Sequence, residues 1–139
     1  PEIIKESSAR FGSQCIVISI DVKLEGGRYE IFSNSPQPVR RDFLEWCSMA
    51  ESLGAGELLI NSVDRDGCMC GFDSALIKTV SERVKIPVIA CGGASEPADF
   101  VQTIQSGASA AAAASLFYFT KTTPEDCRRA MRDADIPAR

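Results

Sequence analysis

Residues 86–106, IPVIACGGASEPADFVQTIQS, decide the fold class of this chain. The apolar run at 86–91 predicts a buried strand, and the glycines of the loop at 92–95 predict a sharp change of direction after it. Apolar residues then recur at helical spacing over 96–106, with Ser95 as the expected N-cap. A buried strand that leads directly into an amphipathic helix is the repeating βα unit of a parallel sheet.

The same strand-then-helix alternation occurs four times along the sequence. The predicted strands cover residues 14–22, 57–63, 86–91 and 109 to about 115, and the predicted helices cover 42–53, 73–84, 96–106 and 123–133. Residues 28–32 predict a hairpin partner for the first strand, and residues 33–40, with two prolines, predict a loop. The alanine run of the fourth strand has helical propensity by itself, but the period of the surrounding units favours a strand, followed by a short turn at SLFYF (115–119).

This repetition indicates an α/β domain in which four consecutive βα units form half of a (βα)8 (TIM) barrel. No Gly-x-Gly-x-x-Gly follows the first strand, so neither a dinucleotide-binding Rossmann domain nor its cofactor is expected. An open four-stranded sheet stays possible, but it would expose long apolar edges. We therefore expect one half-barrel domain over residues 1–139, completed to eight strands by homodimerisation.

The composition excludes several classes of function. The 139 residues weigh 15.0 kDa, are 45% hydrophobic and carry a net charge of −4, which argues against nucleic-acid binding and against long disordered segments. No apolar run is long enough for a membrane span, and no basic-then-apolar signal peptide opens the chain. Pro1 in place of Met indicates either processing or a cut from a longer chain.

Histidine is absent, which excludes histidine-based catalysis, the Ser/His/Asp triad and histidine metal ligands. The six cysteines form no CxxC pair, so we expect no metal site and no disulfide framework, but reduced thiols in a cytoplasmic protein. Acid–base chemistry must therefore come from carboxylates, Lys, Tyr or Cys.

Functional groups of parallel α/β folds gather at the carboxyl ends of the strands. Asp21 follows the first apolar run and is the candidate general acid or base, because a carboxylate at the rim of an apolar sheet can have a raised pKa. A helix cap, or an ion pair with Lys23, is the structural alternative for this side chain.

The third loop is a candidate phosphate site. Glycines let the backbone approach an anion, and the N-terminus of a following helix favours negative charge. Gly92, Gly93 and Ala94 would form the cup, and Ser115, after the fourth strand, would complete it with its amide and hydroxyl. The alternative is a tight turn that needs glycine for its geometry alone.

The second loop, DRDG (64–67), offers Asp66 and Gly67 to the same edge of the sheet. A calcium-binding EF-hand is excluded, because the twelfth position from Asp64 is Ala75 rather than Glu. A ligand-contacting loop and a simple Asp-Gly turn both fit the pattern.

Four stretches resemble the C-terminal half of the cyclase subunit of imidazole glycerol phosphate synthase, in the family's order and over nearly the whole chain. They are GSQCIVISIDVK (12–23), GAGELLINSVDRDG (54–67), GFDSALIKTVSERVKIPVIACGGAS (71–95) and GASAAAAASLFYF (107–119). The related isomerase of histidine biosynthesis shares the fold and the glycine loop. Its last strand usually ends in a GKALY-like motif, where this chain has AASLFYF.

The resemblance implies a (βα)8 barrel of two similar halves that takes ammonia from a glutaminase subunit. With that ammonia it cyclises a phosphorylated ribotide, a lyase step that yields imidazole glycerol phosphate in histidine biosynthesis. Asp21 matches one of two acid–base aspartates, and Glu57 matches a charged residue at the opposite barrel mouth, where ammonia enters. The residues that match one of the two substrate phosphate sites are Asp66, Gly67, Gly93 and Ser115.

The second catalytic aspartate and the second phosphate site belong to the half that this sequence lacks, so three interpretations stay open. The chain is a cyclase that works as a dimer, or it is a non-catalytic module for inorganic phosphate or a phosphorylated ligand that needs a separate N-terminal half. Asn61 stands where many family members have Thr. At this position the sequence resembles a paralogous branch of the family. That resemblance allows a third interpretation, an amidotransferase-associated synthase acting on another acceptor such as a sugar.

Overall fold

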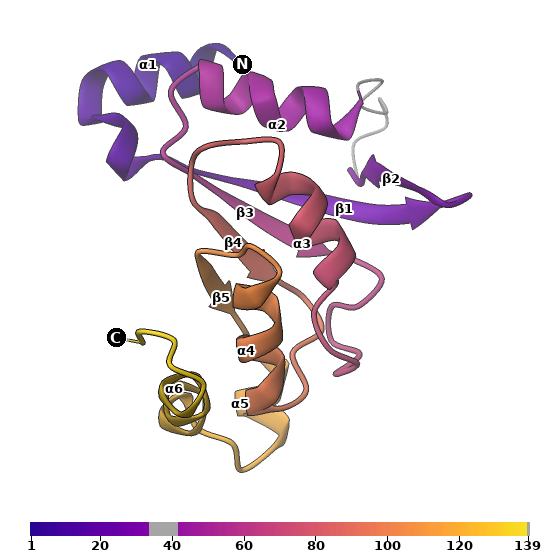
Figure 1. Ribbon diagram of the computed structural model, residues 1–139. Helices are drawn as coiled ribbons and strands as arrows, with labels where there is room; N and C mark the ends of the chain where they lie inside the picture. The colour runs from indigo at the N-terminus through magenta and orange to yellow at the C-terminus, as the bar shows by residue number, and fades with distance from the viewer. Residues whose placement is uncertain (34–41, 139) are drawn as a thin grey trace.

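The computed structural model describes residues 1–33 and 42–138 (Figure 1). Most of the loop predicted at 33–40 therefore lies outside the described residues. The elements are α1 (Glu2–Phe11), a 3-10 turn η1 (Ser13–Cys15), β1 (Val17–Glu25), β2 (Arg28–Ile31), α2 (Phe43–Ser52), β3 (Glu57–Ser62), α3 (Ser74–Ser81), β4 (Val88–Cys91), α4 (Pro97–Gln105), β5 (Ala110–Ala112), α5 (Ser115–Phe119) and α6 (Pro124–Asp133).

One sheet runs through the described chain in the order β2-β1-β3-β4-β5. The neighbours from β1 to β5 pair in parallel, and only the β1–β2 hairpin is antiparallel. The predicted α/β class and the four βα units of a half-barrel are confirmed, including the short alanine strand, which pairs Cys91 with Ala112. The parallel pairing with β4 therefore outweighs the helical propensity of alanine.

The structure corrects four local predictions. Residues 14 and 15 lie in the 3-10 turn, so the first strand begins at Val17 and extends to Glu25. SLFYF is the helix α5 rather than a turn, and the helix α1 was not predicted. The N-cap of α4 is Glu96 instead of Ser95, because the carboxylate of Asp99 turns back onto the chain ahead of the helix.

Helices cover only one face of the sheet in the described residues. Figure 1 shows α3 and α4 side by side along this face, and each contacts its neighbouring strand. The residues of β3 and β4 that face the helices are buried: Leu58, Ile60, Val88 and Ala90. On the opposite face Leu59 and Ile89 are half-buried and Val17 is 47% exposed. An apolar face that stays open is typical of an interface.

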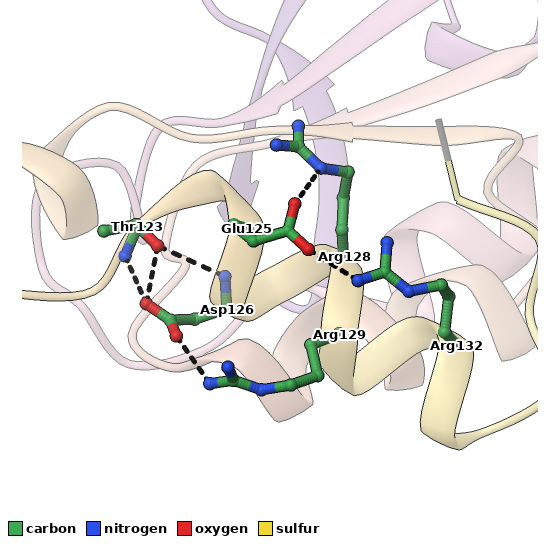
Figure 2. A network of polar contacts seen from close by, with 6 residues as sticks. All are labelled: Thr123, Glu125, Asp126, Arg128, Arg129 and Arg132. Carbon is green, nitrogen blue, oxygen red and sulfur yellow. Dashed lines mark hydrogen bonds and ion pairs between the residues drawn. The ribbon is translucent and has the colours of Figure 1, made fainter.

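The last helix, α6, packs against α4 and holds an ordered charge network (Figure 2). Thr123 caps the helix, and its amide and hydroxyl both donate to the carboxylate of Asp126, at 2.8 and 2.7 Å. Glu125 accepts from Arg132 and Arg128. These bonds lower the pKa values of both carboxyls: Arg132 has the largest effect on Glu125, and Thr123 has the largest effect on Asp126.

Acidification should therefore weaken the attachment of α6. A carboxyl whose pKa is lowered in the folded state stabilises the fold above its unfolded pKa, and that contribution is lost as the pH falls through the folded value. The ordinary values are 4.5 for Glu125 and 3.8 for Asp126. We expect Asp126→Asn to lower the free energy of unfolding at pH 7 and to lower it by a smaller amount at pH 2.5, which is below the ordinary pKa of Asp126. Urea denaturation at the two pH values measures this difference, with Asp133→Asn, outside the network, as the control. An equal effect of Asp126→Asn at both pH values would contradict the assignment.

The described residues contain no helix long and apolar enough to cross a membrane. All six cysteines are free, and Cys47 and Cys127 are buried in the core.

Candidate active site at the carboxyl ends of the strands

One row of side chains crosses the sheet near the carboxyl ends of its parallel strands. The register aligns Asp21 with Asn61, Asn61 with Cys91, and Cys91 with Ala112. Residues in register on neighbouring strands point to the same face, here the face that the helices leave open. The row therefore brings the predicted acid–base residue onto the same surface as the end of β4, where the glycine loop begins.

Asp21 is exposed on this face and accepts a hydrogen bond from Asn61 Nδ2, at 3.0 Å from its Oδ1. The alternative of an ion pair between Asp21 and Lys23 is wrong, because Lys23 Nζ contacts Glu25 Oε1 at 2.9 Å. The hydrogen bond that Lys23 donates to Glu25 raises the pKa of Lys23. Asp21 thus keeps a carboxylate oxygen open to a ligand.

A pocket of about 170 Å³ lies at the same edge of the sheet, between the loops that follow β3 and β4 and the start of α5. Its volume is several times the roughly 30 Å³ that one water takes up in the liquid. Its lining includes all six residues predicted to bind phosphate: Asp66, Gly67, Gly92, Gly93, Ala94 and Ser115. Cys91 and Met69 also line it, and burial raises the pKa of the Cys91 thiol.

Backbone N–H groups around this pocket lack acceptors. Within the described chain, the amides of Gly67, Gly93, Ala94 and Ser115 donate no hydrogen bond. Gly93 and Ala94 are buried, Ser115 is half-buried and Gly67 is exposed. Native structures pair nearly all N–H groups that are withdrawn from water, so unpaired amides at the buried glycine loop suit a ligand with several acceptor oxygens.

The N-terminus of α4 does not offer free donors of this kind, because the side chain of Asp99 already accepts hydrogen bonds there. Asp99 Oδ2 accepts from the amide and hydroxyl of Ser95, at 2.7 and 2.6 Å, and from the amide of Glu96, at 3.0 Å. The anion-binding capacity expected of this helix start is therefore used by the protein itself. The free donors lie instead in the glycine loop before the helix (Gly93 and Ala94), in the loop after β3 (Gly67) and at the start of α5 (Ser115).

Contacts from Arg65 hold the loop after β3 in place. Its Nη1 donates to the carbonyls of Cys70 and Gly71, at 3.3 and 3.2 Å, and its Nε lies 3.8 Å from Asp73 Oδ2. The Gly71 amide in turn donates to the Gly93 carbonyl, at 2.8 Å. The two loops that line the pocket are thus joined.

Asp73 links this loop to the hairpin, since its Oδ1 also accepts from the Tyr29 hydroxyl at 3.0 Å and caps α3 through Leu76. Burial, with the charge of Asp73 next in importance, raises the pKa of Tyr29 to about 12. The roles of Arg65 and Asn61 were not predicted. The partners of Arg65 are mostly backbone carbonyls, which leave no pattern in the sequence, whereas the strand register could have placed Asn61 beside Asp21.

Glu57 begins β3, at the end of the sheet away from the pocket. It stands four residues before Asn61 on the same strand, a separation of about 13 Å at 3.3 Å per residue. Among the described residues, no three Cys, Asp or Glu side chains gather closely enough to hold a metal ion.

The comparisons with known proteins agree on one family. The sequence profile described as "Histidine biosynthesis protein" matches residues 1–123. The HisF subunit of imidazole glycerol phosphate synthase from Dehalococcoides mccartyi strain 195 is 39% identical over 141 aligned positions, which cover 100% of this chain and 56% of the relative. The same subunit from strain CBDB1 is 38% identical with the same coverage.

The chain therefore spans about half the length of the curated relatives it matches. The resemblance inferred from the sequence motifs is confirmed. The sheet of successive βα units is consistent with this match. The chain therefore belongs to the histidine biosynthesis protein family and is similar to about half of HisF.

Proposed function

We propose that the pocket beside the glycine loop binds a phosphate group of a phosphorylated ribotide. The observation that carries this proposal is the group of free backbone donors, the amides of Gly67, Gly93, Ala94 and Ser115, around one small pocket. Gly92 completes the wall of the cup, and Asp66 accepts hydrogen bonds from hydroxyl groups of the ligand. Inorganic phosphate is the simplest ligand for this site.

Asp21 is the general acid or base of an ammonia-dependent cyclisation, a lyase step in histidine biosynthesis. Strands lie about 4.8 Å apart, so the two strand spacings from Asp21 to Cys91 amount to about 10 Å. A substrate held by phosphate at the pocket can reach Asp21 if its reacting atom lies at that distance from the phosphorus. A ribose phosphate with a further substituent has this length.

The reaction also needs a complete barrel, and this chain completes it as a homodimer. The open sheet face and the free edge of β5 are the surfaces to be covered, and a groove of about 480 Å³, lined in part by Ala110 and Ala111, runs along that edge. Two copies would bring two Asp21 carboxylates to one mouth. Glu57, at the other mouth, admits ammonia from a glutaminase subunit, and the assembly works in the cytoplasm.

The solution mass of the chain tests the assembly. We expect about twice 15.0 kDa by light scattering, with a higher melting temperature in phosphate than in chloride at equal ionic strength, because a ligand of the folded state adds RT ln(1 + [L]/Kd) to its stability. A stable monomer in both salts would contradict the homodimer. A dimer without stabilisation by phosphate would contradict the anion site.

A second candidate function is a non-catalytic phosphate-binding half-barrel. It is favoured by the separation of the pocket from Asp21, which is not among the residues that line it. This candidate keeps the pocket in use but makes Asp21 dispensable, so substitution of Asp21 separates the two functions.

A further inference from the structure

Asn61 stands between Asp21 and the anion pocket. Of the two polar atoms of its side-chain amide, only the nitrogen has a hydrogen-bond partner in the described chain. Nδ2 donates to Asp21 Oδ1 at 3.0 Å. The amide oxygen Oδ1 is buried, and no donor in the described chain reaches it. A buried acceptor without a partner costs free energy, so this arrangement calls for a physical reason.

The carboxylate of Asp21 supplies that reason. Turning the amide over would place its oxygen against a carboxylate oxygen, two acceptors facing each other without a proton between them. A hydrogen bond to a charged acceptor is stronger than one between neutral groups. Asn61 therefore keeps its NH2 group toward Asp21 and leaves its own oxygen unpaired.

The wall of the pocket provides the room for this oxygen. A Cβ on Gly92 would lie 2.8 Å from Asn61 Oδ1 and 2.7 Å from the Ser62 carbonyl oxygen, and Gly92 has a φ of +87°. Both distances are too short for a carbon atom to be accommodated without movement. Gly92 lines the anion pocket, so the amide of Asn61 abuts the backbone that forms the cup.

We propose that Asn61 is a positioning residue, which orients the carboxylate of Asp21 toward the substrate and fixes it relative to the anion pocket. The inference rests on the proposed acid–base role of Asp21. Asn61 itself transfers no proton and offers no acceptor to the substrate, because its oxygen is turned into the protein.

The experiment uses NMR of the whole chain first. The side-chain 15N–1H2 resonances of Asn61 should shift when Asp21→Asn removes the charged acceptor, and the carboxyl carbon of Asp21 should shift in Asn61→Leu. Asn61→Thr, which keeps a donor, should restore much of the Asp21 signal. If the Asn61 side-chain resonances do not change in Asp21→Asn, the positioning role is overturned, regardless of the turnover of that variant.

Kinetics of the assembled barrel then separate this inference from the proposed function. We expect Asn61→Leu to lower kcat by about 10²-fold, the cost of a misplaced catalytic group, with KM and the Kd for phosphate within twofold and partial recovery in Asn61→Thr. If Asp21→Asn lowers turnover and Asn61→Leu does not, the positioning role fails alone. If Asp21→Asn leaves turnover intact, the proposed function fails, and the resonances still decide whether Asn61 holds this carboxylate.

Discussion

Asp21→Asn should abolish turnover of the assembled barrel and leave phosphate binding intact. General acid–base catalysis contributes about 10²–10⁴-fold to a rate, and an amide can neither take up nor release the proton. The fold should survive, because Asp21 is exposed and its contact is the side chain of Asn61. The phosphate Kd should stay within twofold, because Asp21 does not line the pocket.

The measurement is the ammonia-dependent rate with a phosphorylated ribotide, together with a phosphate titration of the same samples. Glu25→Gln is a matched control, since Glu25 is an exposed acid on the same strand and pairs with Lys23. Full turnover by Asp21→Asn would reject the cyclase mechanism and favour the non-catalytic half-barrel. A loss of both turnover and phosphate binding would mean that Asp21 shapes the pocket.

Gly93→Ala should have the second large effect, on the pocket itself. A Cβ at this position would lie 2.3 Å from the Gly71 carbonyl oxygen and 2.9 Å from Arg65 Cβ, and the φ of Gly93 is +102°. The loop cannot move away freely, because the Gly93 carbonyl accepts from the Gly71 amide at 2.8 Å. We expect a loss of stability of about 1–3 kcal/mol from the backbone strain, with more from the clash, and at least a tenfold weaker phosphate Kd.

Urea denaturation and a 31P titration check these expectations. Gly27→Ala is the control, because Gly27 has a φ of +80° but no atom within 4 Å of an added Cβ. Gly27→Ala should lose only the conformational cost of a side chain at positive φ, about 1–2 kcal/mol, and should bind phosphate normally. Normal phosphate binding by Gly93→Ala would mean that the glycine loop is a structural turn only.

Much of this architecture follows from residue patterns that are local in the sequence. The runs at 57–63 and 86–91 alternate with amphipathic helices, and parallel strands must place their carboxyl ends at one edge. The sequence could therefore predict that Gly93 and Ser115 come together. The motifs of the glycine loop and of SLFYF also pointed to the family.

The remaining features depend on contacts between distant residues. SLFYF gives too short a pattern to separate a turn from one helical turn, and only packing around Leu116, which is fully buried, settles it. The N-cap of α4 is Glu96, one residue after the predicted Ser95. The difference arises because the carboxylate of Asp99, inside the helix, accepts hydrogen bonds from the amides of both residues. Arg65 donates to backbone carbonyls, which every residue type carries. These bonds therefore depend on the conformation of the loop and could not be predicted from residue types.

The pocket has one more property that follows from its lining. Among the described residues that line it there is no Lys or Arg, Asp66 is one of them, and the whole sequence carries a net charge of −4. The described lining therefore offers no cationic side chain to attract an anion, and on the proposed function a phosphate would reach the pocket at an ordinary diffusive rate. On that proposal its binding would depend on short-range amide dipoles, well inside the Debye length of about 8 Å at physiological ionic strength, and we expect added salt to change the affinity little. The proposed site would then select a ligand by the fit of its oxygens to these N–H groups as well as by charge, and an anion of equal charge but different shape should bind more weakly.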